Sequence, residues 1–268
     1  MFRGADLFSD PVIVGLIALA LILAGVYAGA ESRIRLPEHL LTDETKSLVS
    51  VSTAVVATVS ALVLGLLISN ANTTFTKLGG EVTTLSSQLL RLDHLLRRFG
   101  PAAEPARRKL LEYAEHKADD LFPESAAPVR LGNPGTYELL QQLEDLLLDL
   151  KPANPRDQWW VSQALILAGK IGDSRWLIAQ QVGQGTPKAF VALLVFWLAL
   201  LFASFGLFAP RNWTAAITLM LCAVAVAAAV GMFLELERGL GGLVHISPQP
   251  MRQAVAVLKL APRAPNAP

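Results

Sequence analysis

Four long stretches of this sequence contain no Asp, Glu, Lys, Arg or His. They run from Val12 to Gly29, Leu48 to Ser69, Ala189 to Ala209 and Trp213 to Leu234. A helix needs roughly 20 apolar residues to cross a bilayer, and a chain inside hydrocarbon must satisfy its backbone polar groups internally. Each stretch therefore predicts a membrane-spanning helix.

The first stretch has a second interpretation, as a cleaved signal peptide. Its flank carries one arginine and two aspartates, and its apolar run exceeds the length that a signal sequence needs. We therefore expect a retained span. The composition, 53% hydrophobic and 17% charged, is too apolar for an ordinary soluble domain. Because the net charge is only +1, we expect no nucleic-acid partner.

The positions of Lys and Arg beside the spans predict the orientation of the chain. With four spans, both termini share one side with the long middle region. That side carries Arg3, Lys77, Arg175, Lys188, Arg238 and Arg252. The opposite side carries Arg33, Arg35, Lys46 and Arg211. Because basic residues are enriched in cytoplasmic loops, we expect both termini and the middle region to be cytoplasmic.

Between the second and third spans the sequence predicts a helical bundle. Apolar residues continue past the second span at alternating gaps of four and three, at Leu78, Val82, Leu85, Leu89, Leu92, Leu96 and Phe99. This spacing is typical of a helix that packs on other helices. Further helices are expected from Pro101 to about Leu121, around Leu139 to Leu150, and from Pro155. Asn154 is the expected cap of the last, and Gly172 to Ser174 is a candidate break in it.

The expected architecture is all-α. Residues 1–69 hold the first two transmembrane helices, and residues 70–188 form a cytoplasmic helical module that continues from the second. Residues 189–236 form a transmembrane hairpin. Residues 237–268 are a cytoplasmic tail, in which Ser247 and Pro248 begin a short amphipathic helix. Its apolar side must lie on lipid headgroups, on the bundle or on a neighbouring subunit.

The second span has two unlike faces when it is drawn at about 100° per residue. Slim and hydroxyl-bearing side chains predominate on one face, which comprises Ser50, Thr53, Ala57, Ser60 and Leu64. Bulky apolar side chains occupy the other, which comprises Leu48, Val55, Val59, Leu62, Val63 and Leu66. Bulky residues suit lipid, whereas slim and hydroxyl residues suit either packing between helices or a wet pore. Both alternatives remain open for the slim face.

Small residues four apart recur in three of the spans. They are Gly25 and Gly29 in the first, Ala57, Ala61 and Gly65 in the second, and Ala223, Ala227 and Gly231 in the fourth. Such spacing lets helix backbones approach closely. We expect these residues to be sites of helix packing.

The sequence offers no catalytic motif. Glu112, His116 and either Asp119 or Asp120 lie at helical spacing and could hold a metal, but carboxylates and a single histidine are common on a solvated helix face. We therefore expect no enzyme activity, cofactor or metal. Ion-coupled transporters usually carry ionisable groups inside their spans. Their absence here favours passive permeation or no transport at all.

Several longer stretches resemble the bacterial bestrophin-like membrane proteins, a family of uncharacterised function. They are "FWLALLFASFGLFAPRN", "ELERGLGGLVHISPQPMRQAV", "GLLISNANTTFTKLGGEVTTLSSQLLRLDHLL" and "LLEYAEHKADDLFP". The resemblance covers about Val49 to Leu258. One departure follows the last span, where the family has Asp and then Pro-Phe-x-Gly, whereas this chain has Glu237, Arg238, Gly239, Leu240 and Gly241. The loss of the proline and the aromatic residue predicts a more flexible turn.

The resemblance implies kinship with bestrophins, which are pentameric channels whose pore is lined by the second span. It therefore implies a homo-oligomer in the bacterial plasma membrane that is permeable to small inorganic anions. The alternative is a non-conducting scaffold or sensor, which binds partners or lipids through its cytoplasmic helices.

Overall fold

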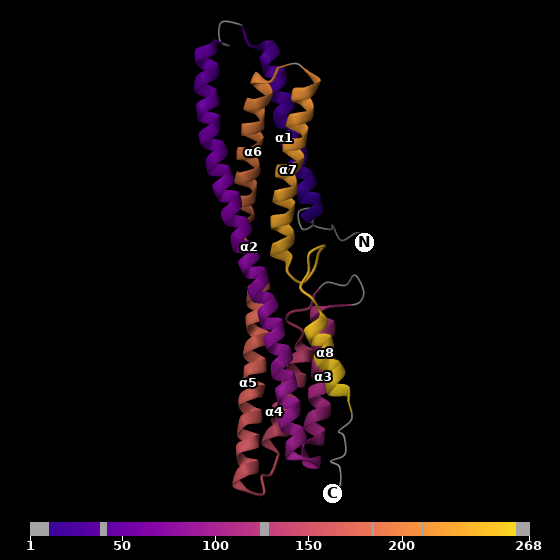
Figure 1. Cartoon of the computed structure of the whole chain (residues 1–268). Helices are drawn as coiled ribbons and strands as arrows, with labels where there is room; N and C mark the ends of the chain where they lie inside the picture. Colours follow the sequence, from indigo (N-terminus) through magenta and orange to yellow (C-terminus); the bar gives the residue numbers. More distant parts are fainter. Residues whose placement is uncertain (1–10, 38–41, 124–128, 184, 211, 261–268) are drawn as a thin grey trace. The chain divides into compact units, whose positions relative to one another are not determined.

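The computed structural model describes residues 11–37, 42–123, 129–183, 185–210 and 212–260, and every regular element in these ranges is a helix (Figure 1). The expected all-α class is confirmed. Arg3 and Arg211, which contributed to the predicted orientation, lie outside the described residues. The chain divides into two compact units. The membrane unit comprises Met1–Thr73 and Gly185–Glu237, and the helical module comprises Thr74–Gln184 and Arg238–Pro268.

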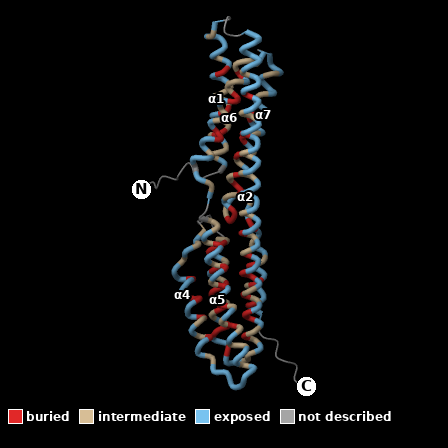
Figure 2. The backbone as a smooth tube through the Cα atoms, turned by 90° about the vertical axis from the view of Figure 1, so that its left-hand side faces the viewer, coloured by how far each residue is buried: buried red, intermediate tan, exposed pale blue. Residues whose placement is uncertain are grey.

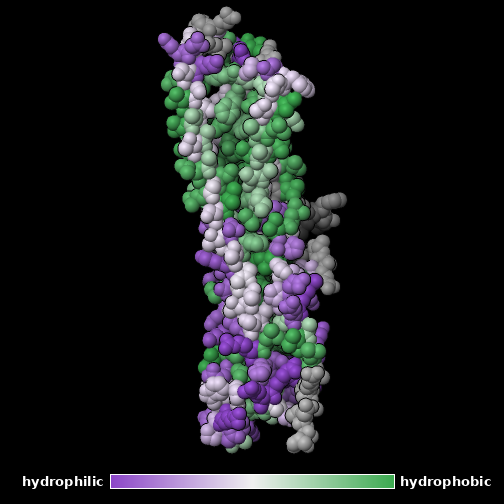
Figure 3. All heavy atoms as spheres, viewed as in Figure 1, coloured by the Kyte–Doolittle hydropathy of each residue, from purple (hydrophilic) through white to green (hydrophobic). Residues whose placement is uncertain are grey.

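Four helices contribute to the membrane unit. They are α1 (Pro11–Arg35), the first part of α2 (Asp43–Phe99), α6 (Lys188–Phe208) and α7 (Trp213–Arg238). Each is long and apolar enough to cross a membrane, and each contains one of the stretches singled out in the sequence. Hydrophobic side chains cover the visible face of this unit (Figure 3).

Glycines bring α1 and α6 into backbone contact. A Cβ atom at Gly25 would overlap the carbonyl oxygen of Ala199, and one at Gly29 would overlap that of Ala203. Gly206 of α6 lies equally close to the carbonyl oxygen of Val26 in α1. Only residues without a side chain permit this approach. The pair therefore packs through its backbones.

The fourth span packs through small residues as well. Ala223 and Ala227 of α7 are buried. The Cα atom of Gly231 lies 3.5 Å from the position that a Cβ atom would take at Gly15 of α1. Small residues in α1, α6 and α7 thus form the closest contacts within this unit.

The helical module contains the rest of α2 with α3 (Glu104–Leu121), α4 (Pro134–Leu148), α5 (Pro155–Gly183), α8 (Gln249–Lys259) and the 3-10 turn η2 (Pro101–Ala103). The prediction that α2 continues into a heptad-patterned helix is confirmed, because its heptad positions are at most 3% exposed, namely Leu78, Val82, Leu85, Leu89, Leu92 and Leu96. Phe99, the last expected position, is half-buried against the same core. Figure 2 shows buried positions recurring along the module's helices. These leucines form the module's core with residues of the other helices.

Helix α5 is continuous, and the break expected at Gly172 to Ser174 was wrong. A Cβ atom at Gly172 would lie 3.7 Å from Leu140 of α4, and the buried Ser174 hydroxyl lies 3.2 Å from Gln88 Oε1, to which it donates a hydrogen bond. These residues are small because neighbouring helices cover them. The expected cap is confirmed, since Asn154 Oδ1 accepts the Asp157 N–H at 2.9 Å.

The amphipathic tail helix α8 lies on the module itself. Its residues Met251, Ala254 and Leu258 are buried, and it contacts α3. Lys259 forms an ion pair with Glu115 of α3 at 2.8 Å. Of the three surfaces considered for this helix, the structure therefore supports the bundle.

The segment after α7 is a closed turn. Gly239 has φ +58°, and its carbonyl accepts the Ile246 N–H at 3.0 Å. A Cβ atom at Gly239 would lie 2.7 Å from Leu78 Cδ2. Glu237 Oε1 accepts the N–H of Thr186, just before α6, at 2.8 Å. Local hydrogen bonds and glycine thus order this turn without the family's proline and aromatic residue.

The module also buries polar and charged groups. Asp93 of α2 is 4% exposed and bonds both Arg97, at 2.5 Å, and the buried Arg107 of α3, at 2.9 Å. Lys117 of α3 is 1% exposed. Tyr113 is fully buried, and its hydroxyl has no hydrogen-bond partner in the described part of the chain.

Candidate pore helix and the cavity beside it

The slim face of α2 packs largely against helices of the same chain. Thr53 is 8% exposed and Ser60 is 2% exposed, while Ala57 and Leu64 are half-buried against a core built by α1, α6 and α7. Ser50, nearest the start of α2, is exposed. The Ser60 hydroxyl is buried with no hydrogen-bond partner among the described residues. From Thr53 to Leu64, side chains of small volume on this face therefore contribute to packing within the chain.

The bulky face points away from these helices. Its exposed members, which are between 43% and 71% exposed, are Leu48, Val55, Val59, Leu62 and Leu66. Val63 differs from the others assigned to this face, because it is half-buried against the core of the membrane unit. The division into a covered slim face and an uncovered bulky face follows the sequence pattern closely.

A third face of α2, which two-sided reasoning missed, is both slim and uncovered. It comprises Ala54, Thr58, Ala61 and Gly65, all exposed. No described atom lies within 4 Å of the position that a Cβ atom would take at Gly65. Ala61 and Gly65 were expected to pack against a helix, but this face turns away from the other helices of the unit. The sequence signal that could have identified this face is the spacing of its four residues, which follow one another after four, three and four positions.

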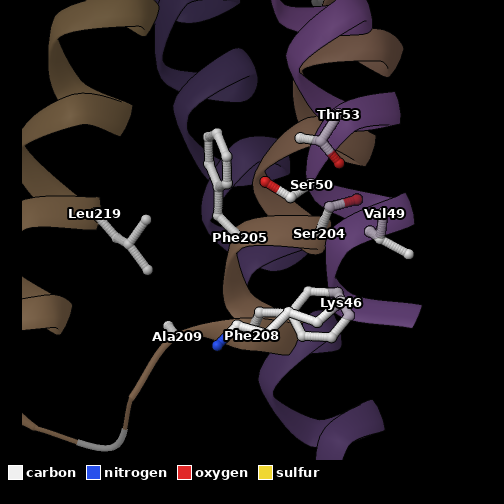
Figure 4. A pocket seen from close by; sticks show the side chains of 9 residues that line it. All are labelled: Lys46, Val49, Ser50, Thr53, Ser204, Phe205, Phe208, Ala209 and Leu219. Carbon is white, nitrogen blue, oxygen red and sulfur yellow. The ribbon is translucent and has the colours of Figure 1, made fainter. Parts of the chain in front are cut away.

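The covered face of α2 ends beside a cavity of about 410 Å³ (Figure 4). Four of its lining residues lie in α2, three in α6, one directly after α6, and one in α7. They are Lys46, Val49, Ser50 and Thr53; Ser204, Phe205, Phe208 and Ala209; and Leu219. The cavity lies where α2 begins and α6 ends, so it is at one end of the membrane unit.

The cavity combines apolar walls with hydroxyls and a cation. Figure 4 shows the Lys46 amine beside Phe208, and the hydroxyls of Ser50, Thr53 and Ser204 on the walls formed by α2 and α6. Ser204 donates to the Leu200 carbonyl of its own helix at 3.2 Å. Arg33, near the end of α1, donates to the carbonyl of Ala209. A second cation therefore lies against the cavity's lining.

The acidic patch on α3 makes contacts within its own helix. His116 Nδ1 lies 2.9 Å from the Glu112 carbonyl oxygen of its own helix, and the Glu112 carboxylate pairs with Lys109 at 2.6 Å. Within the described ranges, no three His, Cys, Asp or Glu side chains are grouped closely enough to hold a metal ion.

The model of the Bestrophin-like domain matches residues 14–251 of the sequence. The chain belongs to the bestrophin-like family. It is therefore a membrane protein by family as well as by its apolar helices. A comparison with curated protein sequences finds no match.

Solved bestrophin homologues share the fold. A variant of a bacterial bestrophin homologue from Klebsiella pneumoniae is similar with a TM-score of 0.64 and 15% identity, over 96% of each chain. A structure of the same homologue phased with zinc gives a TM-score of 0.61 at 14% identity, over 92% of this chain and 95% of that one. At such low identity the likeness shows that the fold is bestrophin-like, and the roles of individual residues must be argued from this chain.

Proposed function

We propose that this protein forms a homo-oligomeric, anion-permeable channel in the bacterial plasma membrane, with α2 beside the central axis. Membership of the bestrophin-like family supports a channel over an enzyme. The observation that carries the proposal is the uncovered slim face of α2, formed by Ala54, Thr58, Ala61 and Gly65.

This slim face is a poor lipid-facing surface. Lipid tails are as apolar as leucine, and the neighbouring bulky face, with Leu62 and Leu66, supplies such side chains. Slim residues on membrane helices are used where another helix approaches or where water enters. We therefore assign Ala54, Thr58, Ala61 and Gly65 to the pore axis of the oligomer. Thr53 and Ser60, the earlier candidates for that role, belong to packing within the subunit.

Permeation is proposed to be passive. No Asp, Glu, Lys, Arg or His occurs between Lys46 and Lys77, so α2 offers no ionisable relay inside the membrane unit. Anion preference is taken from the bestrophins that the chain resembles. We place both termini and the helical module in the cytoplasm, because Lys77, Arg175 and Arg238 lie on that side of the predicted spans.

Cysteine accessibility tests the assignment of the faces. In a background where Cys222 is replaced by Ser, single cysteines are placed at Thr58, Gly65, Thr53 and Val59, and the protein is reconstituted in planar bilayers. A membrane-impermeant thiol reagent should reduce the current of T58C and G65C and leave T53C and V59C unchanged. Reaction at Val59 with silence at Thr58 would instead place the bulky face in the pore.

Ion substitution tests conduction itself. Under a chloride gradient, the reversal potential should move toward the equilibrium potential of chloride, and replacing sodium with a large organic cation should leave it unchanged. Protein that is oligomeric but electrically silent at every voltage would contradict the channel.

Exposed aromatic side chains favour the alternative of a partner-binding scaffold. Trp159 and Trp176 of α5 are 54% and 64% exposed, and Ile166 between them is 48% exposed. Large apolar side chains exposed along one helix are available to a partner protein. Photo-crosslinking from Trp176 in cells distinguishes the two functions: products made only of this chain support the oligomer, whereas a stoichiometric foreign protein supports the scaffold.

A further inference from the structure

The cavity beside α2 lies where a bilayer changes from hydrocarbon to headgroup. The described ends of α1 and α6 and the starts of α2 and α7 lie together at this end of the membrane unit (Figure 1). Arg33 and Lys46 mark the change from apolar to charged sequence on α1 and α2. Because spans are flanked by basic residues at the membrane surface, the cavity reaches from the headgroup region into the outermost hydrocarbon.

The cations at the cavity are free of local carboxylates. Glu31, the nearest acid on α1, pairs with Arg35 at 3.0 Å. Neither Lys46 nor Arg33 forms an ion pair with a carboxylate in the described part of the chain. Asp43 and Glu44 lie in the first turn of α2, where acidic residues stabilise the helix dipole. Two positive groups therefore remain for a ligand.

Much of the cavity wall is apolar. Phe205 and Phe208 of α6 and Leu219 of α7 line it, with Val49 of α2. The volume of about 410 Å³ falls within the range of small-molecule sites, which are mostly apolar with a few polar groups. An inorganic anion would use the cations and leave these walls uncovered. A plain hydrocarbon would fill the walls and leave the cations unpaired.

We propose that this cavity binds a phospholipid, with Lys46 and Arg33 on its phosphate and Phe205, Phe208 and Leu219 on the first methylenes of an acyl chain. The Ser50 and Thr53 hydroxyls lie on the α2 wall of the cavity and would donate to the ester oxygens. Charge-assisted hydrogen bonds to phosphate are short and strong, and the guanidinium of Arg33 keeps further donors after its bond to Ala209. This site is independent of conduction, because lipid is bound whether or not a pore opens.

Thermal melting of the full-length protein in detergent tests the site with three probes. Phosphatidylglycerol carries phosphate and acyl chains, diacylglycerol of the same chains lacks the phosphate, and glycerol 3-phosphate lacks the chains. Phosphatidylglycerol alone should raise the melting temperature in a saturable way. An equal rise with diacylglycerol would overturn recognition of phosphate, and an equal rise with glycerol 3-phosphate would mean a small-anion site and overturn the lipid.

Two variants locate the binding. Lys46→Gln should bind phosphatidylglycerol about tenfold more weakly in native mass spectrometry, as expected for loss of a hydrogen bond to a charged group. Lys151→Gln, an exposed lysine of the module, is the matched control and should bind like the wild type. Leu219→Trp fills the cavity from α7 and should abolish binding with both cations retained. Unchanged binding by Lys46→Gln would overturn the proposal even if Leu219→Trp failed to fold.

Discussion

The membrane unit and the helical module are both built from helices, but different side chains hold them together. In the membrane unit, Gly25, Gly29 and Gly206 bring two backbones into contact. In the module, fully buried leucines such as Leu85 and Leu89 fill the space between helices. Burial of leucine drives association in water, whereas in lipid it gains little because the surrounding tails are equally apolar. In the membrane, close packing between helices is therefore left as the main source of helix association.

The two units also treat charge differently. The module buries Asp93 between two arginines and buries Lys117 without an ion pair among the described residues. The apolar stretches of the membrane unit contain no Asp, Glu, Lys, Arg or His. In the module, the largest changes in stability should therefore come from replacing a large core residue by a small one or from changing a buried polar residue. In the membrane unit, the largest changes should come from enlarging a small residue.

The largest effect is expected from Gly29→Leu. The new side chain would overlap the backbone of Ala203 and Leu207, and backbone cannot give way as a flexible side chain can. Overpacking a well-packed site costs about 1–3 kcal/mol, and more where backbone must move. We expect little folded protein, measured by fluorescence-detected size exclusion in mild detergent.

Gly65→Leu is the matched control for this change. No described atom lies within 4 Å of its Cβ position, so each chain should fold normally, and any effect should appear in the oligomer or in the current. A Gly29→Leu protein that melts within two degrees of wild type would contradict the view that close approach at small residues holds the membrane unit together.

The second effect is Leu89→Ala in the module. Leu89 is 0% exposed, and a large-to-small change in a core typically costs about 2–5 kcal/mol. Thermal melting followed by circular dichroism should show a clear decrease in the melting temperature. Leu148→Ala, at a residue that is 66% exposed, should change stability by at most about 0.5 kcal/mol. Equal effects at the two positions would mean that the heptad leucines do not form the core.

The third-largest effect should be an increase in the stability of the protein, caused by Lys117→Met. Burial lowers the pKa of Lys117, the neighbouring Arg175 lowers it as well and Asp120 opposes both, so that the pKa is about 8. Below pH 8 the ammonium is charged in both the folded and the unfolded chain and carries its full burial cost. Removing that charge should stabilise the protein at pH 7 by about 1–3 kcal/mol.

The pH dependence of stability gives a sharper readout of Lys117. Between about pH 8 and its ordinary pKa of 10.5, the unfolded chain holds a proton that the folded chain has released. Wild-type stability should therefore rise with pH across this window. Lys117→Met should lose that rise, whereas Lys151→Met should keep it. A rise of equal size in the Lys117→Met protein would show that another group causes it.

The smallest effect is expected from Tyr113→Phe. The Tyr113 hydroxyl is buried without a partner among the residues described, and burial raises its pKa above the ordinary value, which keeps it neutral. Because the hydroxyl loses its hydrogen bonds to water on folding, its removal should leave stability unchanged or raise it by about 1 kcal/mol. A clear fall in the melting temperature would reveal a contact made by that hydroxyl.

Much of the fold could be predicted from periodicity. The charge-free stretches and the heptads from Leu78 to Leu96 mark their helices because hydrocarbon and a bundle core each impose a plain pattern on the chain. Single residues that mark a helix cap or a helix break predicted the structure less reliably. Asn154 acts as the expected cap, but Gly172 and Ser174 lie inside a continuous α5, since a small residue suits a crowded contact as well as a break.

The partner of each face of α2 could not be predicted from the sequence. Thr53 and Ala54 are adjacent and both are slim, yet the first is covered by the chain and the second is exposed. Periodicity shows that slim residues share a face, but it does not say which helix lies opposite. The cavity beside Lys46 was equally beyond reach, because its walls come from three helices that are far apart in the sequence.

The length of α6 sets a limit on the membranes that this protein can occupy. Its 21 residues extend about 31 Å at 1.5 Å per residue, scarcely more than the hydrocarbon of an average bilayer. Tilting only shortens the distance that a helix spans, so α6 cannot adjust to a thicker bilayer by tilting. Sterol-rich membranes, a few ångströms thicker, would have to thin around it at an energetic cost. The length of α6 thus restricts the lipid environments in which the protein is stable.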